Sequence, residues 1–399
     1  MNGPVYSLAE GLADFICNRA PAKLSDDLLH QAKRLLLNQF KASAEATLQP
    51  AAQALLRQAK SAPQAHKQDG AAHVWWSDLV TSPEQAADLN AQSLRRLDFG
   101  DTHLPSLGQY TAGLVPELLA RADAGGHTGR RLLEALVVGL EVDIACAKLI
   151  AAQTTRQPGA RPVSIGAIAA NCTLLGRDRK ATTMVLAGLD AGFDMTPAAL
   201  EQLFAGLGQR WHLHDIALHC RPVPAIALAP VDAALALRPQ AGKRSVLGMQ
   251  LGLAPQAWRE VQACNDAPSQ AAAELLHGVA ASWQLGQFTA DELLPACVSD
   301  KGVQALCSRI ELRPDPSCIG LEACSLIVQF DDGSSKQCRI DAFLGAPGQA
   351  LSDSQLSELF RSAANDLVLP RRSGEILQSF WGLDQAPDVR RLVSLLRPA

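Results

Sequence analysis

The sequence lacks several features that define whole classes of protein. It has no basic excess, since the net charge is −4, and so no general attraction to nucleic acid or to an anionic membrane. Its N-terminus, MNGPVYSLAE, lacks the basic-then-apolar layout of a signal peptide. The ten cysteines are scattered, with no Cys-x-x-Cys pair and no Cys/His cluster at zinc spacing. We therefore expect a soluble, cytoplasmic protein with no metal and no nucleic-acid or membrane partner.

A long uncharged apolar stretch is also missing. The most apolar segment, residues 132–152, is interrupted by Glu134, Glu141, Asp143 and Lys148. This pattern predicts a buried core helix and not a membrane span. At 399 residues the chain can bury large cores, and we expect two domains.

Helical patterns fill the first half of the chain. Ser25 and Ser82 stand at N-cap positions before apolar residues at helical spacing, and Pro83 occupies the first position of its helix. A segment rich in alanine and glycine ends at Gly176, which predicts close approach of neighbouring helices. The expected helices cover residues 6–19, 26–40, 86–97, 110–122, 128–152, 180–189 and 196–204, with others starting at Pro50 and ending at Gly176. In this half only residues 73–76 look like a strand.

The pattern changes near Arg221. Four segments have the composition or alternation of strands, at residues 245–251, 308–312, 324–330 and 336–343. The sequence Asp331-Asp332-Gly333 predicts a hairpin between the last two. Helical patterns lie between them at 271–283 and 290–297, and others follow at 352–367, 373–381 and 387–396. The sequence thus predicts a mainly α protein, with a helical domain from both chain ends (1–220 and 346–399) and an inserted α+β lid domain (221–345).

One short segment concentrates the reactive side chains. Asp98, Asp101, Thr102 and His103 fall within six residues of the stretch LRRLDFGDTHLPSLGQYTAGLVP, between two helical patterns. We expect a loop there, because two fixed helix ends can aim short side chains into a shared cleft. The alternative reading of the same spacing is that the acids and the threonine only cap helix ends and turns.

The string LDFGDTHLP resembles the signature of the MmgE/PrpD family, which includes 2-methylcitrate dehydratase, cis-aconitate decarboxylase and iminodisuccinate epimerase. In that family an Asp-Phe-Asp-Asp-Thr-like string is followed shortly by His-Pro-Ser. The resemblance extends over the whole chain. It implies a helical domain with a lid, a homodimer, and lyase chemistry of the dehydratase type on a small polycarboxylate, with no cofactor. Such chemistry needs a base, together with cationic or hydrogen-bonding groups for the substrate carboxylates.

The resemblance places Asp98, Asp101 and Thr102 at the family's Asp and Thr positions, while Gly100 replaces an acid. Two family histidines map onto Gln109 and Gln157, and glutamine forms hydrogen bonds but exchanges no proton at neutral pH. The family lysine is absent, since no lysine occurs from residue 181 to 242. These departures predict a degenerate active site.

The remaining candidates are His103 as proton shuttle, Arg221 as a carboxylate clamp, and His277, where the family often has a tyrosine in the lid helix. A histidine on a helix face is more often structural, so both roles stay open for His277. The alternating spacing of His212 and His214 is compatible with two imidazoles on one side of an extended segment, or with two exposed junction residues. Whether His212, His214 or His219 replaces a missing family histidine also stays open.

Three functions are compatible with this pattern. They are a dehydratase-type lyase with a degenerate site, an inactive homologue that binds a ligand or serves as a structural protein, and an epimerase or isomerase of a small dicarboxylate. We expect little or no turnover of 2-methylcitrate or cis-aconitate, and any activity should depend on His103. We also expect the motif segment, residues 156–164 and Arg221 to converge at the mouth between helical domain and lid.

Overall fold

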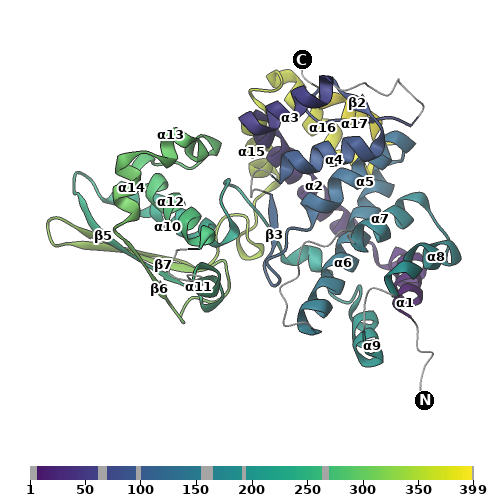
Figure 1. The fold of residues 1–399 in the computed structure, drawn as a ribbon, viewed down its shortest axis with the longest axis horizontal. Coiled ribbons are helices and arrows are strands. Elements are labelled where there is room, and N and C mark those ends of the chain that lie inside the picture. The colour runs from purple at the N-terminus through teal and green to yellow at the C-terminus, as the bar shows by residue number, and fades with distance from the viewer. Residues whose placement is uncertain are drawn as a thin grey trace. The chain divides into compact units, whose positions relative to one another are not determined.

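The computed structural model describes residues 7–61, 70–95, 100–153, 165–190, 195–262 and 269–397, without the side chains of 151–153 and 189–190. The described chain is mainly helical, with one small mixed sheet (Figure 1). It divides into two units. Unit 1 comprises Met1–Leu97, Gly108–Ile216 and Asp353–Ala399, and unit 2 comprises Asp98–Leu107 and Ala217–Ser352.

Unit 1 is built from helices of both chain ends. Helices α15 and α16 pack against α2, so the last part of the chain covers one of the first helices (Figure 1). Its helices are α1 (Leu8–Asp14), continued by a π-helix (Phe15–Arg19), α2 (Asp26–Leu48), α3 (Pro50–Ser61), α4 (Pro83–Leu94), α5 (Thr111–Gly125), α6 (Gly129–Gln153), α7 (Ile165–Leu175), α8 (Arg179–Asp190), α9 (Pro197–Gly206), α15 (Asp353–Ala364), α16 (Pro370–Trp381) and α17 (Arg390–Leu395), with 3-10 turns at Pro21–Lys23, His212–Asp215 and Leu383–Gln385. The helices expected in this part of the sequence are confirmed.

The helix ends follow local rules that the sequence carries. The Ser25 hydroxyl accepts a hydrogen bond from the amide of Leu28 at the start of α2. The Ser82 hydroxyl accepts one from the amide of Gln85, with Pro83 in the first turn of α4. Helix α5 ends at Gly126, whose φ of 62° is a left-handed conformation that glycine adopts without strain. Each cap satisfies a backbone group that the helix itself leaves unpaired.

Helices α6 and α7 cross at two glycines. A Cβ atom on Gly166 would lie 2.4 Å from the carbonyl oxygen of Gly139, and one on Gly139 would lie 2.8 Å from that of Gly166. The two backbones therefore touch at this crossing, which confirms the expected close approach of the segment rich in small residues.

Unit 2 contains a four-stranded sheet in the order β6-β5-β7-β8. Strand β5 (Val246–Leu253) is parallel to β6 (Ile310–Pro314) and antiparallel to β7 (Cys324–Phe330), which pairs with β8 (Ser335–Ile340) in a hairpin through Gly333. All four expected strands are present. The helices of the unit are α10 (Ala225–Leu237), α11 (Pro255–Val261), α12 (Gln270–Leu285), α13 (Pro295–Val298) and α14 (Lys301–Cys307), with 3-10 turns at Arg238–Gln240, Ala290–Leu293 and Pro347–Gln349.

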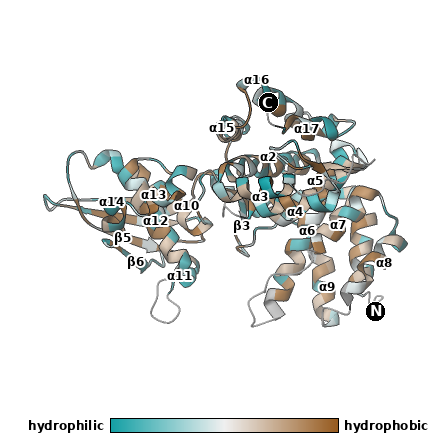
Figure 2. Ribbon diagram, turned by 45° about the horizontal axis from the view of Figure 1, so that its top comes forward, coloured by the Kyte–Doolittle hydropathy of each residue, from teal (hydrophilic) through white to brown (hydrophobic). Residues whose placement is uncertain are grey.

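Helix α10 packs on β7, β8 and α12, and it is apolar on almost all sides (Figure 2). Most of its residues are buried in the core of unit 2, which also contains Leu104 from the motif segment. Among the described residues, no helix is both long enough and apolar enough to cross a bilayer.

Two expectations about local structure are wrong. Asp101–His103 form a strand, β3, that pairs with β4 (Ile216–Leu218), although we expected a loop there. His212–Asp215 form a 3-10 turn, so the alternation of an extended segment does not apply to His212 and His214. A further strand pair, β1 (Ala72–His73) with β2 (Val80–Thr81), includes one residue of the segment that resembles a strand.

Candidate active site

Strand β3 carries three polar side chains that are almost fully buried. Asp101 and Thr102 are each 2% exposed, and His103 is 0% exposed. The amide of His219, just after β4, donates to the carbonyl of Gly100 over 2.9 Å and extends the contact between the two segments. A strand that buries an acid, a hydroxyl and an imidazole is costly unless those groups have partners, and such sites are often functional.

The side chains of Thr102 and His219 meet inside unit 2. Thr102 Oγ1 lies 3.0 Å from His219 Nε2, and the imidazole of His219 is fully buried. A hydroxyl both donates and accepts, so either tautomer of the histidine satisfies this contact. The motif threonine is thus joined to a histidine from a distant part of the sequence. The sequence alone left the role of His219 open.

His103 is oriented by a turn that follows the strand. Its Nδ1 lies 2.7 Å from Ser106 Oγ, and the amides of Ser106 and Leu107 donate to its carbonyl oxygen over 3.2 and 2.8 Å. Leu104, inside the turn, packs in the core of unit 2, and Leu107 packs against that core. The turn therefore fixes both the backbone and the ring of His103. An imidazole held in this way suits general acid–base chemistry.

Arg221 lies against helix α10. Its Nε donates to Asp232 Oδ1 over 3.2 Å, and Asp232 Oδ2 accepts from the amide of Leu344 over 3.1 Å. The carboxylate of Asp232 therefore holds the guanidinium in place and offsets its charge. A guanidinium has five N–H donors, so one bond through Nε leaves the bidentate face of the group for other acceptors.

His277 has a structural environment in unit 2. Its Nε2 lies 2.8 Å from the carbonyl oxygen of Glu292, and its ring meets Phe288 edge to face at 6.0 Å. A carbonyl oxygen only accepts hydrogen bonds, so Nε2 carries the proton here. This contact joins helix α12 to the 3-10 turn at Ala290–Leu293. These contacts favour a structural role for His277.

Of the remaining candidates, the structure describes only Gln109. Gln109 is exposed in unit 1, two residues before α5 begins. Asp98 and Gln157 lie outside the described residues, as does the whole 156–164 segment.

Glu141 and His212 form a buried polar contact in unit 1. The two carboxylate oxygens of Glu141 accept from the amides of Gly208 and His212, each over 2.9 Å. Burial raises the pKa of Glu141, and these hydrogen bonds limit the rise. Burial, assisted by the positive charge of Lys148, lowers the pKa of His212 to about 4. His212 is therefore neutral near pH 7, whereas His214 in the same turn is exposed.

Helix α2 also contains buried polar residues that its apolar pattern did not reveal. Lys41 is 1% exposed and Asn38 is 0% exposed, although lysine is almost never fully buried. One turn beyond Lys41, Glu45 has a raised pKa of about 7, because burial outweighs the attraction of Lys41. The signal in the sequence is Lys41 and Glu45 at i, i+4 among alanines and a serine, which suits a solvated face equally well.

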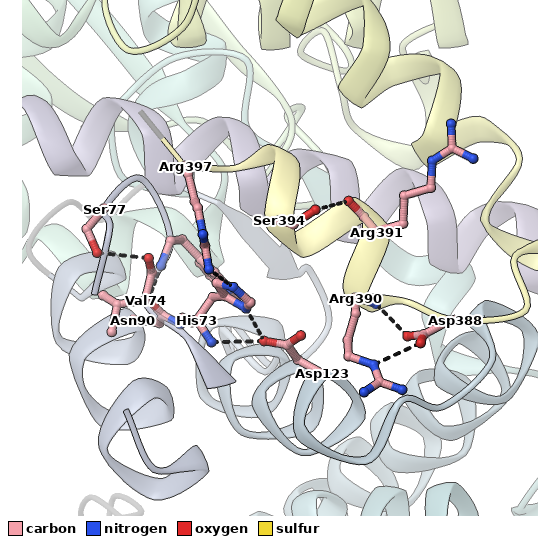
Figure 3. A network of polar contacts seen from close by, with 11 residues as sticks. His73, Val74, Ser77, Asn90, Asp123, Asp388, Arg390, Arg391, Ser394 and Arg397 are labelled. Atoms are coloured by element: carbon pink, nitrogen blue, oxygen red, sulfur yellow. Dashed lines mark hydrogen bonds and ion pairs between the residues drawn. The ribbon is translucent and has the colours of Figure 1, made fainter. Parts of the chain in front are cut away.

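A separate polar network in unit 1 includes Arg397, the last residue that the structure describes (Figure 3). Asp123 Oδ2 accepts from the amide of His73 and lies 2.8 Å from its Nδ1, while Arg397 contacts the other ring nitrogen of His73. The Asp123 side chain is 1% exposed. These contacts tie β1 and the segment after α17 to α5, so we assign this network to stability.

Two family models match the chain and cover most of it. The MmgE/PrpD N-terminal domain matches residues 10–214, and the MmgE/PrpD C-terminal domain matches residues 222–383. The resemblance carried by the motif segment is thereby confirmed. No curated protein matches the chain.

Proposed function

The chain belongs to the MmgE/PrpD family, and from this membership we propose that it is a lyase-type enzyme that abstracts a proton next to a carboxylate of a small polycarboxylate. The observation that carries this proposal is the buried pair of histidines in unit 2. His103 and His219 stand on β3 and just after β4, and each is fixed by a hydroxyl, of Ser106 and Thr102 respectively. Two oriented imidazoles provide the proton donor and acceptor that an elimination requires.

In the proposed reaction His103 is the base. The carbon next to the substrate carboxylate loses its proton to the imidazole, and the electron pair of the C–H bond forms a double bond as the C–O bond to the hydroxyl group breaks. The departing hydroxide accepts a proton and leaves as water. His219, through the hydroxyl of Thr102, is suited to provide that proton. Because Ser106 holds Nδ1 of His103, the proposal assigns the proton exchange to Nε2.

The negative charge that develops on the substrate needs hydrogen-bond donors and cations around it. In the proposal Arg221 binds a substrate carboxylate with its guanidinium edge while Asp232 holds its Nε. Asp98 and Asp101 belong to the motif and would orient substrate hydroxyls, and Gln109 and Gln157 would supply hydrogen bonds without proton exchange. His277 is the weakest member, because its contacts are those of a structural residue. The expected convergence of the motif segment, residues 156–164 and Arg221 stays a prediction.

The departures from the family pattern predict a weakened parent reaction. Loss of one general acid or base typically costs about two to four orders of magnitude in rate. Glutamines at positions 109 and 157 and the missing lysine are three such losses. The same substitutions favour the second candidate, a homologue that binds a polycarboxylate without turning it over. An epimerase would also use two imidazoles, and it needs no group to assist departure of hydroxide.

The proposal includes an arrangement of domains and an assembly. Residues 1–220 and 346–399 form the helical domain, residues 221–345 act as its lid, and the helical domain forms a cytoplasmic homodimer. A symmetric dimer is the commonest soluble oligomer.

Steady-state turnover of the purified chain on a panel of small di- and tricarboxylates, 2-methylcitrate and cis-aconitate among them, tests the proposal. We expect slow or no turnover of these two acids. For any acid that is turned over, His103→Asn should lower kcat by about a hundredfold or more. His214→Asn changes an exposed histidine outside the proposed site and serves as the control. Robust turnover of 2-methylcitrate that His103→Asn leaves unchanged would contradict the assignment.

A further inference from the structure

A pocket of about 560 Å³ lies entirely within unit 1, between α6, α9 and the 3-10 turn that contains His212. Both α9 and this turn pack on α6. Its apolar lining residues are Ala145, Leu149, Leu203 and Leu207. Its polar lining residues are Lys148, Arg210, His212 and Asp215, together with two glutamines. The volume falls in the range of small-molecule sites, which combine apolar walls with a few polar groups.

Three charged side chains hold the wall of this pocket in place. Arg19 donates to the carbonyls of Phe204 and Leu207 over 2.8 and 3.2 Å, and Lys23 donates to that of Gly208 over 3.0 Å. Glu141 accepts from the amides at both ends of the next stretch, Gly208 and His212. These hydrogen bonds therefore fix the segment from α9 to the 3-10 turn. A preformed wall lowers the entropy that a ligand loses when it binds.

The residues that line the pocket carry two cations, Lys148 and Arg210, and one carboxylate, Asp215, and the buried Glu141 carboxylate attracts Lys148. Arg210 Nη2 pairs with Asp215 Oδ1 at 2.6 Å, so these two charges offset each other. Lys148 forms no ion pair within the described part of the chain, and its side chain is exposed to the pocket and to solvent. The imidazole of His212 is neutral near pH 7, because burial lowers its pKa to about 4. Among the lining residues the excess charge is thus positive, and apolar side chains belong to the same lining.

We propose that this pocket binds a small carboxylate with a short hydrocarbon segment, its carboxylate at Lys148 and its hydrocarbon against Leu149 and Leu203. The carboxylate accepts from the ammonium group of Lys148, while the neutral His212 adds no charge to the pocket. Asp215 opposes the anion, and its pairing with Arg210 limits that repulsion. The described residues that line the pocket all belong to unit 1.

Calorimetric titration of the full chain with hexanoate tests this site, with hexylammonium as the probe of opposite charge. We expect saturable binding of hexanoate that weakens as salt is raised, and no binding of hexylammonium. Lys148→Met should weaken hexanoate binding by about fivefold or more, since the contact is charged but open to water. Asp215→Asn should tighten it, because the variant removes the opposing charge and frees Arg210.

Lys180→Met is the matched control, since Lys180 is an exposed lysine of α8 that does not line the pocket. It should leave the affinity unchanged. Thermal unfolding of each variant checks that it is folded. The proposal is overturned if hexanoate shows no saturable binding, if hexylammonium binds as well as hexanoate, or if Lys148→Met binds like the parent.

Discussion

Substitution of Glu45 by glutamine should stabilise the protein, and the gain should depend on pH. The Oε2 atom of Glu45 is buried and makes no hydrogen bond to any residue that the structure describes. Burial raises its pKa from 4.5 to about 7, even though the charge of Lys41 one turn away on α2 acts in the opposite direction. The charged carboxylate is therefore destabilised in the folded protein, and a neutral amide of the same shape avoids that penalty.

The direction in which the free energy of unfolding changes with pH follows from proton linkage. Between pH 4.5 and about 7 the folded state binds more protons at Glu45 than the unfolded state, so the free energy of unfolding falls as pH rises through this window. A shift of this size corresponds to on the order of 3 kcal/mol above pH 7 and about 1 kcal/mol at pH 5.5. Glu45→Gln should recover these amounts, so the variant gains most in alkaline solution.

Urea unfolding at pH 5.5, 7.0 and 8.5 measures this difference directly. Glu201→Gln is the control, because Glu201 is exposed on α9 and should change stability little at any pH. A gain that is the same at all three pH values would refute the assignment of the buried charge to Glu45. So would a Glu45→Gln variant that is less stable than the parent at pH 8.5.

Three further predictions concern a helix crossing, the buried His73 network and the assembly. Gly166→Ala should lower the free energy of unfolding in urea by about 1–3 kcal/mol, because the new Cβ atom would lie 2.4 Å from the backbone of α6. Gly188→Ala is the control: it has open space around it and should be neutral or slightly stabilising, and equal effects of the two variants would contradict the close crossing. Asp123→Asn should lower the free energy of unfolding by about 1–3 kcal/mol, and Asp388→Asn, which changes a more exposed ion pair, should lower it by less than about 0.5 kcal/mol. A larger loss of stability in Asp388→Asn than in Asp123→Asn would contradict the stabilising role of the His73 network. Sedimentation at micromolar concentration should show a dimer, and a 42.4 kDa species alone would count against it.

Local signals in the sequence were sufficient to predict most helices and the hairpin between β7 and β8. Ser25 and Ser82 mark helix starts through their own hydroxyls, and Gly126 marks an end through its left-handed conformation. Gly333 does the same for the turn between β7 and β8. These residues act within four positions of themselves, so their effect is visible without knowledge of the fold.

Helix α10 was missed for a physical reason. Its sequence AIALAPVDAALAL is apolar on almost every side because the helix is buried in unit 2, so it has no polar face and no helical period. Pro230 in its interior is a further signal against a helix. Tertiary burial, which the sequence does not display, stabilises this element.

The candidate site depends on contacts between distant residues. Thr102 and His219 are separated by 117 positions, and β3 finds its partner strand at a similar distance, so no spacing rule predicts either pairing. The motif revealed His103 because its residues are neighbours in sequence. Lys41 was missed because lysine is usually a surface residue, and only the packing around α2 buries it.

Exchange of the substrate proton with solvent tests the central proposal most directly, because it requires proton abstraction but no departure of water. The chain is incubated in D₂O with 2-methylcitrate, citrate or malate, and the signal of the C–H next to the carboxylate is followed by proton NMR. The proposal predicts exchange on at least one of these acids, about a hundredfold slower in His103→Asn and unchanged in His214→Asn. Absence of exchange with all three acids, or exchange that His103→Asn leaves intact, would contradict it.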